Sequence, residues 1–148
     1  MDLYHSFFYV YLESTMMPLN IDYLIGLHNK ARDEGSWLWD IMPLTKNEKL
    51  MTFAQEWAEH MAKVNRMYHS SMREIMQLGF STAGENIAWG VNDVEKVMNI
   101  WLHSKGHKAN IISSKFSAIG AGVATSTKGK KFWCVCFGCP SKGKIGFY

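Results

Sequence analysis

The chain has 148 residues, a length typical of one compact domain that folds without disulfide bonds or a structural metal. Hydrophobic residues make up 47% and charged residues 20%, a composition that excludes disordered and collagen-like chains. The formal net charge of +3 is too small to indicate nucleic acid as a partner. No apolar run reaches the roughly twenty residues that cross a bilayer, so we expect no transmembrane segment.

The first 17 residues form an aromatic-rich segment without a helical or alternating period. We expect them to be an N-terminal extension to a single domain over residues 18–148, docked on that domain or on a protein partner, a second copy of the chain included. The first Lys or Arg is Lys30, so the sequence has no clear signal peptide.

Two helices are predicted in the first half of the domain. Apolar and polar residues from Ile21 to Arg32 repeat at steps of three and four, and Gly35 ends this helix. The sequence Thr45-Lys-Asn-Glu48 fits a capping box, which predicts that a long helix begins there. Its apolar stripe runs from residue 50 to residue 64.

In the middle of the chain, the sequence predicts a short helix, a short strand and another helix. A second capping box, Ser71-Met-Arg-Glu74, begins the first of these helices. Residues 85–89 are predicted to form a strand, and Asn92 or Asp93 caps the next helix. We expect Gly106 to end that helix in the left-handed conformation.

The last third is predicted to be a β-hairpin over residues 118–125 and 131–137. Gly120 and Gly122 lie inside the first of its strands, which predicts that another element packs closely on that face. Helices followed by antiparallel strands indicate an α+β domain with helices layered on a small sheet.

The three cysteines, Cys134, Cys136 and Cys139, are too few and too crowded to be a disulfide framework. We interpret them as buried apolar thiols. The alternative is that Cys136 and Cys139 form a redox pair, although no strand-to-helix setting precedes them.

Three polar residues, His69, Glu85 and His107, are expected at the boundaries of predicted elements, where side chains are often displayed for function. Two imidazoles and a carboxylate offer nitrogen and oxygen ligands to Zn²⁺ or a similar divalent cation. Their spacing matches no local metal-binding motif.

Several segments, in their order along the chain, resemble the CAP superfamily of cysteine-rich secretory, antigen 5 and pathogenesis-related proteins. The resemblance covers about residues 20–139 and is strongest to the small prokaryotic branch, which lacks a cysteine-rich extension. The segments are His28-Asn-Lys-Ala-Arg32, His69-Ser-Ser71, Gly84-Glu-Asn-Ile-Ala-Trp-Gly90, Trp101-Leu-His-Ser-Lys-Gly-His-Lys-Ala-Asn-Ile111, Ile119-Gly-Ala-Gly122, Phe132-Trp133 and Phe137-Gly138.

The resemblance implies a three-layer α-β-α sandwich with a small antiparallel sheet, and a shallow cleft in which two histidines and two acidic residues bind a divalent cation. The histidines correspond to His69 and His107, and one acid corresponds to Glu85. Ser104 occupies the position of the second acid, with His103 beside it, so we expect cation affinity to be weaker or more dependent on pH.

The resemblance does not place His28, Asn29 and Arg32, which lie on the first predicted helix, among the cation-binding residues of the cleft. An amide and a guanidinium on one helix face can satisfy the carbonyl groups of nearby loops. We therefore interpret these residues as structural.

A binding module is the function that the resemblance favours, because it implies no reaction common to the family. The expected location is extracellular or in the cell envelope, and the expected ligand is a peptide, a glycan or a lipid. One alternative is a hydrolase that uses Glu85, or a water held by His69 and His107, as the base on peptide or cell-wall material. The other is an assembly protein anchored through residues 1–17.

Overall fold

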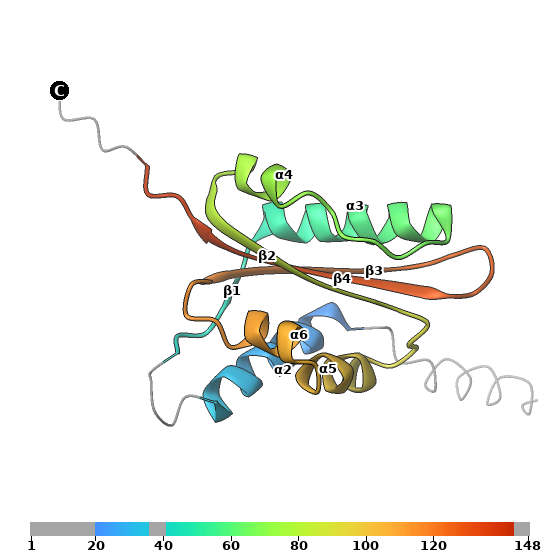
Figure 1. Cartoon of the computed structure of the whole chain (residues 1–148), viewed down its shortest axis with the longest axis horizontal. Coiled ribbons are helices and arrows are strands. Elements are labelled where there is room, and N and C mark those ends of the chain that lie inside the picture. The colour runs from blue at the N-terminus through green and yellow to red at the C-terminus, as the bar shows by residue number, and fades with distance from the viewer. Residues whose placement is uncertain (1–19, 36–40, 144–148) are drawn as a thin grey trace, which may run out of the picture.

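The computed structural model describes residues 20–35 and 41–143, which form five helices and one four-stranded sheet (Figure 1). The helices are α2 (Ile21–Glu34), α3 (Glu48–Val64), α4 (Met72–Gln77), α5 (Val94–Leu102) and α6 (Lys105–Ile111). The strands are β1 (Thr45–Lys46), β2 (Phe80–Trp89), β3 (Ala118–Thr125) and β4 (Lys131–Pro140). The proposed extension over residues 1–17 lies outside the described residues.

The sheet has the strand order β1-β3-β4-β2. Strands β3 and β4 form the predicted hairpin, and β2 pairs with β4 in the antiparallel direction. The sheet is therefore antiparallel as expected, except that the short strand β1 pairs with β3 in the parallel direction at one edge. Because β2 is the other outer strand, side chains from both helical layers can reach across its edge.

Helices cover both faces of the sheet, which confirms the three-layer α-β-α sandwich (Figure 1). Helices α3 and α4 pack on one face, and α2, α5 and α6 pack on the other. Alternation along β4 supplies both cores, since Trp133 and Val135 face the α2–α5–α6 layer while Cys134 and Cys136 face the α3–α4 layer.

Two glycines of β3 allow α3 to lie directly on the sheet, as the sequence predicted. A Cβ atom added at Gly120 would lie 2.1 Å from the backbone carbon of Leu50, and one at Gly122 would lie 2.4 Å from Cα of Gln55. No side chain fits between the helix and the strand at these positions.

Helix α3 begins later than the capping box predicted. Its N-cap is Asn47, whose side chain accepts hydrogen bonds from the amides of Lys49 and Leu50. Thr45 is instead part of β1, because its amide donates to the carbonyl of Ser117. Ser71 is the N-cap of α4 as predicted, but its side chain makes no capping hydrogen bond.

Two predictions near the site were also wrong. Strand β2 begins at Phe80, five residues before the predicted start, so Glu85 lies in the middle of the strand. Gly106 does not end a helix but lies in α6, and His107 is therefore a helical residue. Of the seven residues of α6 only Ile111 is buried, so the sequence lacks the apolar stripe by which a helix is recognised.

The polar face of α2 has the structural role that we expected. The Arg32 guanidinium donates to the carbonyl oxygens of Met42, Ile111, Ser113 and Phe116 at 2.9–3.2 Å. The Asn29 side chain forms a reciprocal pair of hydrogen bonds with the backbone of Leu44. These bonds fix the segment before α3 and the segment after α6 on one side of the sheet.

Candidate functional site

The segment between α3 and α4 carries the first site residue, His69. Helix α3 ends at Asn65, which has a left-handed backbone with φ of 51°. Tyr68 is then fixed on α3, because its carbonyl oxygen accepts a hydrogen bond of 2.9 Å from Nε1 of Trp57 and its hydroxyl bonds to His60. This anchor places the next two residues, His69 and Ser70, against the outer strand β2.

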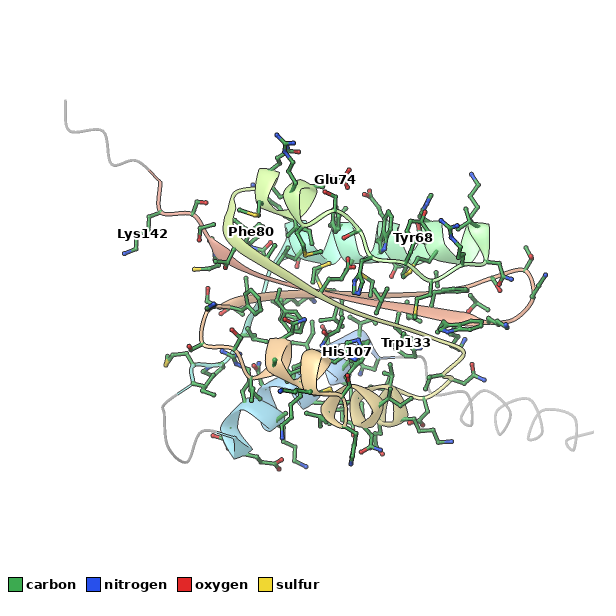
Figure 2. All side chains as sticks on the ribbon, in the orientation of Figure 1. Tyr68, Glu74, Phe80, His107, Trp133 and Lys142 are labelled. Carbon is green, nitrogen blue, oxygen red and sulfur yellow. The ribbon has the colours of Figure 1, made fainter. Side chains whose placement is uncertain are left out.

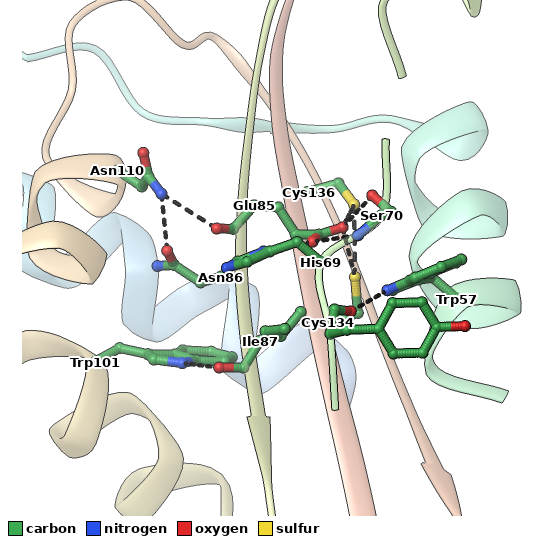
Figure 3. Close-up of polar contacts among 11 residues, drawn as sticks. Trp57, His69, Ser70, Glu85, Asn86, Ile87, Trp101, Asn110, Cys134 and Cys136 are labelled. Carbon is green, nitrogen blue, oxygen red and sulfur yellow. Dashed lines mark hydrogen bonds and ion pairs between the residues drawn. The ribbon is translucent and has the colours of Figure 1, made fainter. Parts of the chain in front are cut away.

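Glu85 is the centre of the site and is 5% exposed (Figure 3). Its Oε1 accepts hydrogen bonds from Nδ1 of His69 at 2.8 Å and from the amide of Ser70 at 3.0 Å. Its Oε2 accepts from the Ser70 hydroxyl and from the thiols of Cys134 at 3.6 Å and Cys136 at 4.0 Å. A buried carboxylate needs such partners, and here both oxygens have them.

The carboxylate of Glu85 fixes the orientation of His69. With Nδ1 as the donor to Glu85, the lone pair of the neutral ring lies on Nε2. The side chain of His69 is 59% exposed, whereas that of Glu85 is almost completely buried. A histidine held by a buried carboxylate in this way is typical of metal ligands and of general bases.

His107 approaches from the opposite layer of the sandwich. Figure 2 shows it on the α6 side of the sheet, whereas Tyr68 lies on the α3 side. Its Nδ1 is buried and has no hydrogen-bond partner among the described residues. Burial lowers the pKa of His107 below its usual value of 6.5, and the neighbouring charge of His69 lowers it further. The ring is therefore neutral at physiological pH, which is the state that binds metals.

Two asparagines dock α6 against β2 (Figure 3). The Asn86 side chain donates to the carbonyl oxygen of His107 at 3.0 Å. The Asn110 side chain donates to Oδ1 of Asn86 at 2.9 Å and to the carbonyl oxygen of Glu85 at 3.3 Å. These bonds cover the outer edge of β2 and hold α6 against it.

The structure therefore links His69 to Glu85 directly, whereas no hydrogen bond joins the His107 side chain to either of them among the described residues. His103 and Ser104 lie at the junction of α5 and α6. Nδ1 of His103 bonds to the carbonyl oxygen of Asn99, four residues earlier. In the part of the chain that the structure describes, no hydrogen bond joins either residue to Glu85.

Three neighbours of Glu85 were not predicted from the sequence: Ser70, Cys134 and Cys136. The two cysteines are buried as expected, and burial raises the pKa of Cys134 well above its usual value, so this thiol is neutral. The signal that could have found them is register, because Cys136 pairs directly with Glu85 across β2 and β4. That register depends on a long-range strand pairing and cannot be read from either strand alone.

The fold and the histidine–carboxylate group together define an α-β-α sandwich domain with a polar site at the edge of its sheet. Residues 25–137 match the family described as "CAP: Cysteine-rich secretory protein family". The match covers most of the chain, so the chain belongs to this family.

The chain is similar to known proteins of several organisms. It is 33% identical over 94 residues to "Uncharacterized protein YkwD" of Bacillus subtilis, a match that covers 58% of this chain and 37% of that protein. Its fold is similar to that of an outer surface protein from Borrelia burgdorferi at 22% identity and a TM-score of 0.72, with coverage of 81% of this chain and 92% of that one. Its fold is also similar to that of the protein in "Crystal structure of NaASP2 with Zn2+", at 14% identity and a TM-score of 0.63. This match covers 86% of this chain and 88% of that one.

No helix within residues 20–35 and 41–143 has the length and apolar character that spanning a membrane requires.

Proposed function

We propose that the chain is a CAP-domain binding module in which His69 and His107 hold a divalent cation, with Zn²⁺ as the favoured ion. Glu85 orients His69 and does not itself need to bind the ion. The module recognises an extracellular or envelope ligand that is a peptide, a glycan or a lipid. An outer surface protein and a protein crystallised with Zn²⁺ among the structures that share the fold support this proposal.

The observation that carries the proposal is the buried Nδ1 of His107, which has no partner among the described residues. A buried polar atom without a partner is costly, and a neutral imidazole nitrogen is a ligand that Zn²⁺ prefers. When bound, the cation would supply a Lewis-acidic centre with open coordination positions for a ligand or water.

The protein's own residues then account for the strength of the site. The Nδ1 hydrogen bond from His69 to Glu85 makes the ring more basic and fixes its direction. Ser104 stands where the resemblance implies a second acid, and a hydroxyl adds no negative charge. We therefore expect weaker cation affinity than a complete tetrad would give.

Calorimetric titration with Zn²⁺ tests the proposal on the full chain. His107→Ala and His69→Ala should each lower the affinity by at least about tenfold, because each removes a direct ligand, and Glu85→Gln should lower it about 10–100-fold through the orientation of His69. His103→Ala is the matched control, since His103 is an exposed histidine on the neighbouring turn. Equal affinity in the wild type, His69→Ala and His107→Ala would remove the cation from the function.

A further inference from the structure

A second group of ligand atoms lies behind Glu85, on the side away from the exposed ring of His69. Sγ of Cys134 and Sγ of Cys136 are 3.7 Å apart, and both thiols face Oε2 of Glu85. All three side chains are buried, and their ligand atoms lie within 4.8 Å of one another. The histidines of the proposed cation site do not belong to this group.

The backbone sets this convergence. Cys134 and Cys136 are two residues apart on β4, so their side chains emerge on the same face of the sheet. Glu85 pairs with Cys136 in the β2–β4 register, so its side chain emerges beside the two thiols. Because all three residues lie inside paired strands, the ligand atoms are held by the sheet backbone and not by a loop.

The distances fit a tetrahedral metal ion. With metal–sulfur bonds of about 2.3 Å and a metal–oxygen bond of about 2.0 Å, the edges of the tetrahedron are about 3.8 Å between sulfurs and about 3.5 Å from sulfur to oxygen. The measured edges are 3.7 Å between the sulfurs and 3.6 and 4.0 Å from sulfur to Oε2. Each edge is thus within about half an ångström of its ideal length.

Two neighbouring residues, Ser70 and His69, hold the carboxylate of Glu85 in place beside the thiols. The Ser70 hydroxyl donates a hydrogen bond to Oε2 and so supports the carboxylate oxygen that faces the thiols. His69 holds the other carboxylate oxygen, Oε1, and so fixes the direction of Oε2.

We propose that Cys134, Cys136 and Glu85 form a buried site for a thiophilic divalent cation such as Zn²⁺, for which the softer Cd²⁺ serves as an analogue. Two thiolates and a carboxylate favour such ions over Mg²⁺ or Ca²⁺. The ion displaces the two thiol protons, which leave to solvent. This site is distinct from the histidine site and does not require it, although both use Glu85.

Titration of the full, reduced chain with Co²⁺ in the absence of oxygen tests the proposal, because only a thiolate ligand gives Co²⁺ an intense near-ultraviolet charge-transfer band. We expect one equivalent to produce the band. Cys134→Ser and Cys136→Ser should each abolish it. Cys139→Ser, which changes a partly exposed thiol on the same strand, should leave it unchanged.

The same titration separates the two sites. His107→Ala should weaken Zn²⁺ binding at the histidine site and leave the cobalt–thiolate band intact. A wild-type chain without the band, or a band that persists in both Cys134→Ser and Cys136→Ser, would overturn the buried site, whatever happens at the histidines.

A measurement on the unmodified chain keeps the test decisive if the core variants do not fold. Alkylation in mild denaturant, followed by mass mapping of each cysteine, should be slowed at Cys134 and Cys136 by added Cd²⁺ and not at Cys139. Equal rates with and without Cd²⁺ at all three cysteines would mean that the thiols are simply apolar core residues with weak hydrogen bonds to Glu85.

Discussion

Glu85 connects two groups of residues through its two carboxylate oxygens. One oxygen faces His69 and the amide of Ser70, and the other faces the Ser70 hydroxyl and the two buried thiols. The resemblance to the family identified Glu85 and His69 as residues to place together. The thiols looked apolar in the sequence because only the register of β2 with β4 brings them to the carboxylate.

The burial of His28 makes the stability of the fold depend on pH. Its Nδ1 donates to the carbonyl oxygen of Leu24, its ring packs near Trp101 and Phe137, and burial lowers its pKa from 6.5 to about 4. The unfolded chain therefore binds one more proton than the folded chain between these values. Stability from this residue is complete above pH 6.5 and is lost as the pH falls towards about 4, in total by about 3 kcal/mol.

Urea unfolding of the wild type and of His28→Leu at pH 7, 5.5 and 4 measures this contribution. The free energy of unfolding of the wild type should fall more steeply with acid than that of the variant, by about 3 kcal/mol over the whole range. Parallel pH profiles of the two proteins would contradict the assignment.

Substitution of Arg32 should cause a large loss of stability, because its guanidinium holds several backbone segments together. Its guanidinium donates to four carbonyl oxygens, and the side chain is buried. Arg32→Met would leave those carbonyls without their donor, and we expect the free energy of unfolding to fall by about 3 kcal/mol or more. Lys30→Met, an exposed position on the same helix, should change it by less than about 0.5 kcal/mol. Equal effects of the two variants would show that the network adds nothing.

Among the elements, those with an apolar period or a helix cap in the sequence were predicted, whereas β1 and α6 were not. Helix α2, the hairpin of β3 and β4 and the position of α5 follow from apolar spacing and caps in the sequence. Helix α6 was missed because Gly106 indicates a stop and one buried residue makes no stripe. Tertiary hydrogen bonds from Asn86 and Asn110 support this helix, and these bonds leave no local pattern.

The different surroundings of Gly120 in β3 and Gly106 in α6 predict opposite effects of their substitution by alanine. Gly120→Ala places a methyl group against the α3 backbone, which cannot move aside, and should lower the free energy of unfolding by about 2–3 kcal/mol. Gly106→Ala adds a methyl group in open space within α6 and should raise it by about 0.5–1 kcal/mol. Thermal or urea unfolding of both variants measures the signs, and a destabilising Gly106→Ala or a neutral Gly120→Ala would contradict the packing.

At the scale of the whole molecule, the sandwich explains why the site lies where it does. The sheet ends at β2, so a loop of the α3–α4 layer and a helix of the α2–α5–α6 layer both reach its edge. Helix and strand patterns in the sequence predicted helices layered on a small sheet, and the resemblance implied the three-layer sandwich and the residues at its edge. The order of the strands, and with it the position of β2 at the edge of the sheet, comes from long-range pairing that no local pattern carries.

Anomalous scattering from crystals grown with Zn²⁺, recorded on both sides of the zinc absorption edge, would locate the cation directly. We expect a peak within coordination distance of Nε2 of His69 and of the His107 ring, with Nδ1 of His69 still bonded to Glu85. Well-ordered His69 and His107 side chains without a zinc peak between them would contradict this expectation.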